Sequence, residues 1–389
     1  MSVFAFPSST SGTARSTRPL LVLVAATAVA LLAGCGSTPS AAPDAGSTSA
    51  PATSTPEADV PSPSVPPSST VTLLAHDSFV VSEQLLADFT ERTGVTIEVV
   101  TAGDAGTMVA GAILAAGAPI ADVIFGVDNT LVSRALDGGV FDPYTSPELA
   151  SLLPELQDDT AGGAVTPVDY GDVCVNIDDA YFAERGLAAP STLDDLVAPQ
   201  YRDLLVVEDP GTSSPGLAFL LATIARYGDG WAEYWRALDA NGVTVASSWT
   251  DAYMGDFTAG GGNGDRPLVV SYATSPPAEI VYAAEPKPTA PSTSVMTDGC
   301  YRQVEYAGVL AGAANAAGAR AVVDWLVSEP VQSDVPLSMF VFPARSGVAL
   351  PEVFTKFAAT VPDPLRVDSQ EVTDNLSSWL SEWGTVMGR

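Results

Sequence analysis

Apolar residues recur along the chain in two rhythms, the short runs typical of buried strands and the three-to-four-residue spacing typical of amphipathic helices. A run at 71–75 predicts a strand, and the stretch 82–94 predicts a helix with a serine cap and a glycine stop. Residues 95–99 alternate as a second strand, and Asp104 is expected in a loop that leads into an apolar helix ending near Gly117. A third strand at 120–125 completes a βαβαβ order, which is typical of an α/β fold.

The same alternation returns in the second half of the chain. Residues 204–207 predict a strand, 209–215 a loop and 216–227 an apolar helix. Further strands are expected at 243–246 and 268–270. The pattern therefore indicates two α/β units.

Ligands of open α/β sheets bind beyond the carboxyl ends of the strands, and here those ends carry polar and aromatic side chains. The candidates are His76, Asp104, Asp128, Ser213, Ser214, Trp249 and Tyr272 to Ser275, with Asp128 expected as the N-cap of the next helix. Two lobes with such residues at facing strand ends predict a clamshell binding protein.

Each candidate has a chemical and a structural interpretation. Ser213 and Ser214 precede a proline at a helix start, which could bind an anion such as phosphate or could be ordinary capping. Trp249 and Tyr272 offer faces for a flat heterocycle or a cation. Asp104 could offset a positive charge, or cap a helix.

The first 34 residues have the parts of a secretory signal, with two arginines, an apolar run and small residues before Cys35. Cys35 stands where a bacterial lipoprotein is cut and lipidated. A transmembrane anchor is the alternative, although the apolar run is shorter than the roughly 20 residues that a spanning helix needs. The Ser/Thr/Pro-rich stretch to residue 69 cannot bury a core and is interpreted as a tether.

Charge and motifs narrow the function further. Without the signal the chain keeps 14 basic and 46 acidic residues, so nucleic acid is not an expected partner. The chain lacks G-x-S-x-G, H-E-x-x-H and P-loop motifs, and it has 1 histidine, which argues against common hydrolases and multi-histidine metal sites. We expect no catalytic residues, no metal and no cofactor.

Two cysteines remain besides Cys35. In an oxidising compartment, Cys174 and Cys300 are expected to pair as a disulfide. Two separate buried thiols are the alternative.

Seven motifs in order resemble the substrate-binding proteins of thiamine ABC transporters. They span nearly all of the folded part and comprise residues 76–79, 121–129, 167–171, 209–217, 249–253, 271–276 and 303–305. The resemblance implies a type II periplasmic-binding fold, a two-lobed clamshell with a hinge of crossing strands. It divides the chain into 1–34 (signal), 35–69 (tether), 70–168 (first lobe), 169–302 (second lobe) and 303–389 (return to the first lobe and C-terminal helices).

The resemblance also implies a function. Such a protein binds thiamine or its phosphate esters and delivers it to the permease and ATPase subunits of an ABC importer, as a monomer held on the outer face of the cell membrane by its lipid. The implied ligand contacts are Asp104, Ala105, Ser213, Ser214, Trp249 and Tyr272, Ala273, Thr274 and Ser275, with His76, Asp128 and Phe340 as further candidates. Cys174 and Cys300 would fall on the hinge.

Three positions depart from the family pattern. His76 stands where some members have tyrosine, Ala278 where a pocket aromatic can occur, and Phe340 where tryptophan can occur. His76 is either a ligand contact or a capped strand-end residue.

Two other functions are compatible with a related fold. A thiaminase-like enzyme would use Cys174 or Cys300 as its nucleophile, which pairing of the two would exclude. A binding protein for iron(III) or a polyamine is the other alternative, although adjacent tyrosines typical of iron sites are absent.

Overall fold

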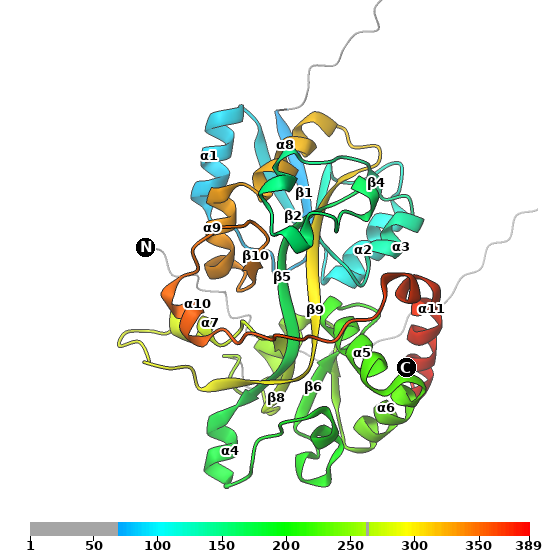
Figure 1. Cartoon of the computed structure of the whole chain (residues 1–389), viewed down its shortest axis with the longest axis vertical. Helices are drawn as coiled ribbons and strands as arrows, with labels where there is room; N and C mark the ends of the chain where they lie inside the picture. The colour runs from blue at the N-terminus through cyan, green and yellow to red at the C-terminus, as the bar shows by residue number, and fades with distance from the viewer. Residues whose placement is uncertain (1–68, 262–263) are drawn as a thin grey trace, which may run out of the picture. The chain divides into compact units, whose positions relative to one another are not determined.

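The computed structural model describes residues 69–261 and 264–389. The predicted signal, Cys35 and the tether up to residue 68 lie outside the described residues. The described strands form one mixed sheet, whose main path runs in the order β2 (Thr96–Thr101), β1 (Thr70–Ala75), β3 (Val123–Asp128), β9 (Thr293–Leu310), β5 (Thr166–Asp178), β8 (Leu268–Tyr272), β6 (Leu205–Glu208) and β7 (Thr244–Ala246). Helices cover it in two lobes (Figure 1).

The first lobe has the predicted βαβαβ order. Its elements are β1 (Thr70–Ala75), α1 (Glu83–Thr93), β2 (Thr96–Thr101), α2 (Ala105–Leu114), β3 (Val123–Asp128), α3 (Val132–Asp137) and β4 (Phe141–Asp142). β1 pairs in parallel with both β2 and β3. Gly94 ends α1 in the left-handed conformation, with a φ of 71°, which glycine adopts without strain.

Among the boundaries in this lobe that differ from the sequence prediction, two concern β3. The third strand begins at Val123 because Ile120 is 71% exposed and takes no part in the sheet. Asp128 is the last residue of β3, and the N-cap of α3 is Leu131, so the prediction of Asp128 as N-cap was wrong. Its carboxylate nevertheless accepts the N–H groups of Thr130 and Leu131, at 3.0 and 3.1 Å.

Two long strands connect the lobes. β5 (Thr166–Asp178) and β9 (Thr293–Leu310) run antiparallel from one lobe into the other, with Asp169 opposite Glu305 and Val173 opposite Tyr301 (Figure 1). They are the hinge of crossing strands that the resemblance implied. Three short 3₁₀ turns precede β5, at Pro147–Ser151, Pro154–Leu156 and Ala161–Gly163.

A disulfide joins Cys174 of β5 to Cys300 of β9, across 126 residues of sequence. The pairing prediction and its location on the hinge strands are confirmed, and the alternative of two separate thiols was wrong.

The second lobe repeats the α/β pattern. Its elements are α4 (Asp179–Arg185), β6 (Leu205–Glu208), α5 (Ser214–Tyr227), α6 (Trp231–Ala240), β7 (Thr244–Ala246), β8 (Leu268–Tyr272) and α7 (Pro277–Tyr282), with short turns η4 (Leu193–Val197), η5 (Pro199–Tyr201), η6 (Gly228–Gly230) and η7 (Asp251–Asp256). β6 pairs in parallel with β7 and β8. α5 begins two residues before the predicted start, because Pro215 fits its first turn.

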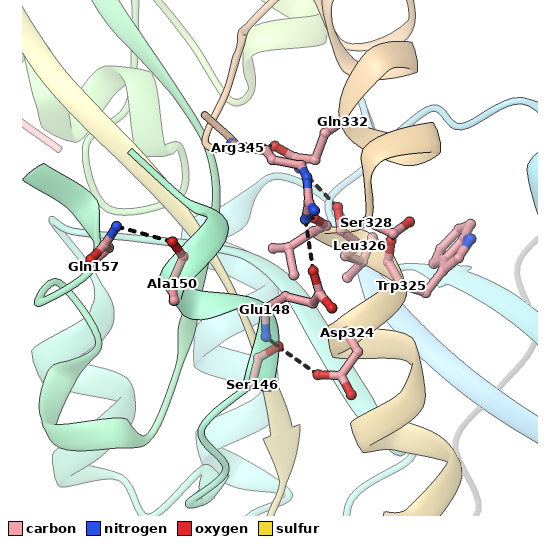
Figure 2. Close-up of polar contacts among 11 residues, drawn as sticks. Ser146, Glu148, Ala150, Gln157, Asp324, Trp325, Leu326, Ser328, Gln332 and Arg345 are labelled. Carbon is pink, nitrogen blue, oxygen red and sulfur yellow. Dashed lines mark hydrogen bonds and ion pairs between the residues drawn. The ribbon is translucent and has the colours of Figure 1, made fainter. Parts of the chain in front are cut away.

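The chain then returns to the first lobe. α8 (Ala316–Leu326) and α9 (Glu329–Ser338) follow β9, and β10 (Phe342–Pro343) pairs with β5. The side chain of Arg345 donates to the Glu148 carboxylate at 2.9 Å, as Figure 2 shows. It also donates to the carbonyl of Val327 at 2.9 Å. The backbone N–H of Arg345 also donates to buried Gln332, at 2.9 Å.

The end of the chain, from α10 onward, crosses back to the second lobe. α10 (Glu352–Phe357) is followed by a segment that runs beside the hinge, where Leu365 pairs with Tyr301 of β9. α11 (Ser369–Val386) then packs on α6, with the Trp383 ring 5.6 Å from that of Trp235 (Figure 1). Within the residues that the structure describes, no helix is both long and apolar enough to cross a bilayer.

Candidate ligand-binding site

Asp104 joins three segments from the two lobes. It is the N-cap of α2, and its Oδ1 accepts the backbone N–H groups of Ala105 at 2.6 Å and of Ser214 at 3.4 Å. Its Oδ2 accepts the N–H of Trp249 at 2.9 Å. The predicted capping role is present, and the same carboxylate also contacts the second lobe.

The lobes meet directly beside Asp104. The N–H of Thr107 in α2 donates to the carbonyl of Thr212, which precedes α5, at 3.1 Å. Gly106 faces the same carbonyl so closely that an added Cβ would lie 2.7 Å from it. Only a glycine in this position permits the approach of the two backbones.

Ser214 is bonded from both sides. Its hydroxyl donates to Asp128, and the Gln303 side-chain amide donates to that hydroxyl at 2.6 Å. Burial raises the pKa of Asp128 to about 6, although the hydroxyls of Ser214 and Thr130 partly oppose this shift. Gln303, on β9, lies in one of the resembling motifs but was not predicted as a site residue.

Ser213 is the N-cap of α5 but makes no side-chain capping bond. Its hydroxyl is buried and has no hydrogen-bond partner. The capping interpretation of this hydroxyl was therefore wrong.

The aromatic candidate Trp249 is half-buried and stacks on Tyr253, with ring centroids 5.1 Å apart and planes 16° apart. Its indole N–H donates to the Ser271 hydroxyl at 2.9 Å, which in turn bonds the Ser275 hydroxyl at 2.9 Å. These bonds orient the indole next to the turn that follows β8.

That turn also contacts the first lobe. Ser275 accepts the N–H of Tyr272 at 3.3 Å, and Thr274 donates to the carbonyl of Phe340 at 2.5 Å. Phe340 has a φ of 55°, a left-handed conformation that is rare for a bulky residue and strained. Ala273 accepts the N–H of Ala359 at 2.9 Å.

His76 is buried at the end of β1 and has partners at both ring nitrogens. Nδ1 lies 2.9 Å from the Ser78 hydroxyl, and Nε2 lies 3.4 Å from the carboxylate of Glu305. Burial lowers the pKa of His76, but the charge and hydrogen bond of Glu305, together with the charges of Asp104 and Asp77, outweigh burial and raise the pKa overall. A Cβ at Gly126 would lie 2.2 Å from the imidazole, so a glycine is needed there.

Three buried acids of the site were missed in the sequence. Asp169 and Glu305 lie opposite each other on β5 and β9, and burial together with Glu305 raises the pKa of Asp169 well above its usual value. Glu208 ends β6, is 0% exposed, and neither carboxylate oxygen has a hydrogen-bond partner in another residue. Burial, and after it the charge of Asp104, raises the pKa of Glu208 well above its usual value.

The structure thus places the predicted candidates in one connected junction between the lobes. Hydrogen bonds link Asp104 to Ala105, Ser214 and Trp249, and link Ser214 to Asp128. His76, at the end of β1, contacts the hinge strand β9 through Glu305, and Phe340 contacts the second lobe through Thr274. Whether each contacts a ligand remains a prediction.

One concave region lies away from the junction and holds none of these residues. A hollow of about 570 Å³ lies on the first lobe, lined in part by Ser151, Gln157 and Arg345. Among the described residues, no group of three or more His, Cys, Asp or Glu side chains is placed to hold a metal ion.

Two α/β lobes on crossing strands, with polar and aromatic residues where the strand ends meet, define a two-lobed solute-binding protein. The chain belongs to the bacterial extracellular solute-binding protein family, whose model matches residues 118–363.

Its relatives are named binding proteins. The chain is 27% identical to the thiamine-binding periplasmic protein of Brucella suis biovar 1 (strain 1330), over 82% of this chain and 92% of the relative. It is 29% identical to the thiamine-binding periplasmic protein of Escherichia coli (strain K12), over 69% of this chain and 77% of that protein.

Solved structures agree on the fold. A periplasmic thiamin binding protein matches with a TM-score of 0.71 and 26% identity, covering 82% of this chain and 96% of that chain. A ferric binding protein from Campylobacter jejuni matches with a TM-score of 0.65 at 14% identity, covering 81% of this chain and 99% of that chain, a likeness of fold alone.

Proposed function

We propose that this protein is an exported receptor that binds thiamine between its lobes and passes it to an ABC importer. The named relatives support thiamine as the ligand. The observation that carries the proposal is the position of Asp104, whose carboxylate accepts backbone N–H groups of both lobes, that of Trp249 among them. A carboxylate and an aromatic face suit a cationic thiazolium joined to a flat aminopyrimidine.

The proposal also includes how the receptor is held at the membrane and which proteins receive its ligand. Cys35 carries a lipid that holds the receptor at the outer face of the membrane, and the permease and ATPase subunits of the importer receive the thiamine. The receptor acts as a monomer. Mass spectrometry of the mature protein tests the anchor: an unmodified Cys35 would contradict it.

We propose a binding protein and no enzyme. The disulfide engages both Cys174 and Cys300, so neither is free to serve as the nucleophile of a thiaminase-like reaction. Incubation with thiamine and a nucleophilic base tests this, and decay of thiamine would contradict it.

Calorimetry with thiamine, iron(III) and spermidine tests the choice of ligand. We expect micromolar or tighter binding of thiamine, and a loss of at least about tenfold in Trp249→Ala, since a cation over an aromatic face contributes roughly 1–2 kcal/mol. Trp379→Ala is the control, because Trp379 is also half-buried but lies on α11, outside the junction. Tight spermidine or iron binding without a thiamine signal would overturn the proposal.

A further inference from the structure

The start of α5 is surrounded by acids rather than by bases. Asp104 accepts a hydrogen bond from the backbone N–H of Ser214, and Asp128 accepts one from the Ser214 hydroxyl. Glu208 is the last residue of β6, the strand that precedes α5. Among the described residues, no lysine or arginine forms a hydrogen bond or ion pair with these three acids.

A phosphate site needs the reverse arrangement. Helix starts bind phosphate through free N–H groups, and arginine or lysine usually adds charge. Here the N–H of Ser214, in the first turn of α5, donates to Asp104, and its hydroxyl to Asp128. The chain's own carboxylates therefore occupy donors that a phosphate would use.

Glu208 distinguishes this junction from ordinary helix capping. Its side chain is fully buried, no other residue bonds its oxygens, and the charge of Asp104 acts on it. The nearby Ser213 hydroxyl is likewise buried without a partner. Unsatisfied polar groups of this kind are costly unless a ligand uses them.

We propose that Glu208 is a specificity-determining residue, which together with Asp104 and Asp128 makes the junction accept unphosphorylated, cationic thiamine and reject thiamine phosphates. This inference rests on the proposed function. A cation favours the ionised carboxylate of Glu208 and releases its proton, whereas a phosphate monoester brings about −1.5 to −2 charges toward three acids.

The test compares thiamine and thiamine monophosphate by calorimetry on the full mature chain. The wild type should bind thiamine at least about tenfold more tightly than the monophosphate, and Glu208→Gln should narrow that ratio to about threefold or less. Glu98→Gln, an identical change on an exposed strand residue, should leave the ratio unchanged. Equal affinities in the wild type, or an unchanged ratio in Glu208→Gln, would overturn the inference.

A second measurement needs only the wild type. Thiamine binding enthalpies in buffers of different ionisation enthalpy should reveal release of a proton, and no release at pH 7 would also count against the role of Glu208. If the folded wild type binds neither thiamine nor its monophosphate, the proposed function itself fails, which is a distinct outcome.

Discussion

At the scale of single residues, burial determines the chemistry of the junction. Asp128 is 0% exposed, and burial raises its pKa from 3.8 to about 6. The folded protein therefore holds a proton on Asp128 at a pH where the unfolded chain has already lost it.

This shift predicts a pH dependence of stability. The stabilising contribution of protonated Asp128 is fully present below about pH 3.8 and is lost as the pH rises through about 6, a change on the order of 2–3 kcal/mol. Urea unfolding of the wild type and Asp128→Asn, from pH 4 to pH 7, measures it. The free energy of unfolding of the wild type should fall relative to that of the variant as the pH rises. A difference in this free energy that stays constant from pH 4 to pH 7 would contradict the prediction.

At the scale of elements, the hinge strands are covalently joined. The disulfide between Cys174 and Cys300 closes a loop that contains the second lobe from α4 to α7, and the pair is buried with Ala273 and Val361. A cross-link over a sequence separation of 126 residues restricts the unfolded chain strongly.

We expect Cys174→Ser with Cys300→Ser to lower the free energy of unfolding by about 2–5 kcal/mol. Chemical denaturation measures the loss, and reduction of the wild type should reproduce most of it. An unfolding midpoint that responds to neither treatment would show that the bond does not stabilise the hinge.

The elements also show what sequence could and could not predict. The βαβαβ order was predictable because 71–75 and 95–99 keep a clear apolar pattern. The full extent of β5 and β9 was not, since these strands carry buried polar residues such as Asp169 and Gln303. Glu208 was not predicted as a site residue because in the sequence it is simply the polar residue at the end of an apolar strand. Its burial results from the packing of α5 against it, which the sequence does not show.

At the scale of the whole molecule, we expect closure of the lobes to depend on the close approach between α2 and the segment before α5. Gly106→Ala would place its methyl carbon 2.7 Å from the Thr212 carbonyl, a distance that forces the backbones apart. The lobes should then close less completely, with the fold of each lobe preserved.

We expect Gly106→Ala to weaken thiamine binding at least about tenfold, a cost of roughly 1.4 kcal/mol. Gly111→Ala is the matched control, because it lies in the same helix with nothing within 4 Å of the added carbon. Calorimetry of both variants measures the effect on thiamine binding, and thermal unfolding measures the effect on the stability of the fold. Unaltered affinity in Gly106→Ala would mean that this approach is not required for binding.

The final course of the chain has a practical consequence. The described chain starts beside β1 in the first lobe, whereas Arg389 at its end bonds the carbonyl of Val245 at 3.2 Å and lies 3.7 Å from Asp209 in the second lobe. A donor dye attached before β1 and an acceptor dye attached after Arg389 would therefore lie on opposite lobes. Energy transfer between them would convert the receptor into an optical sensor for its ligand.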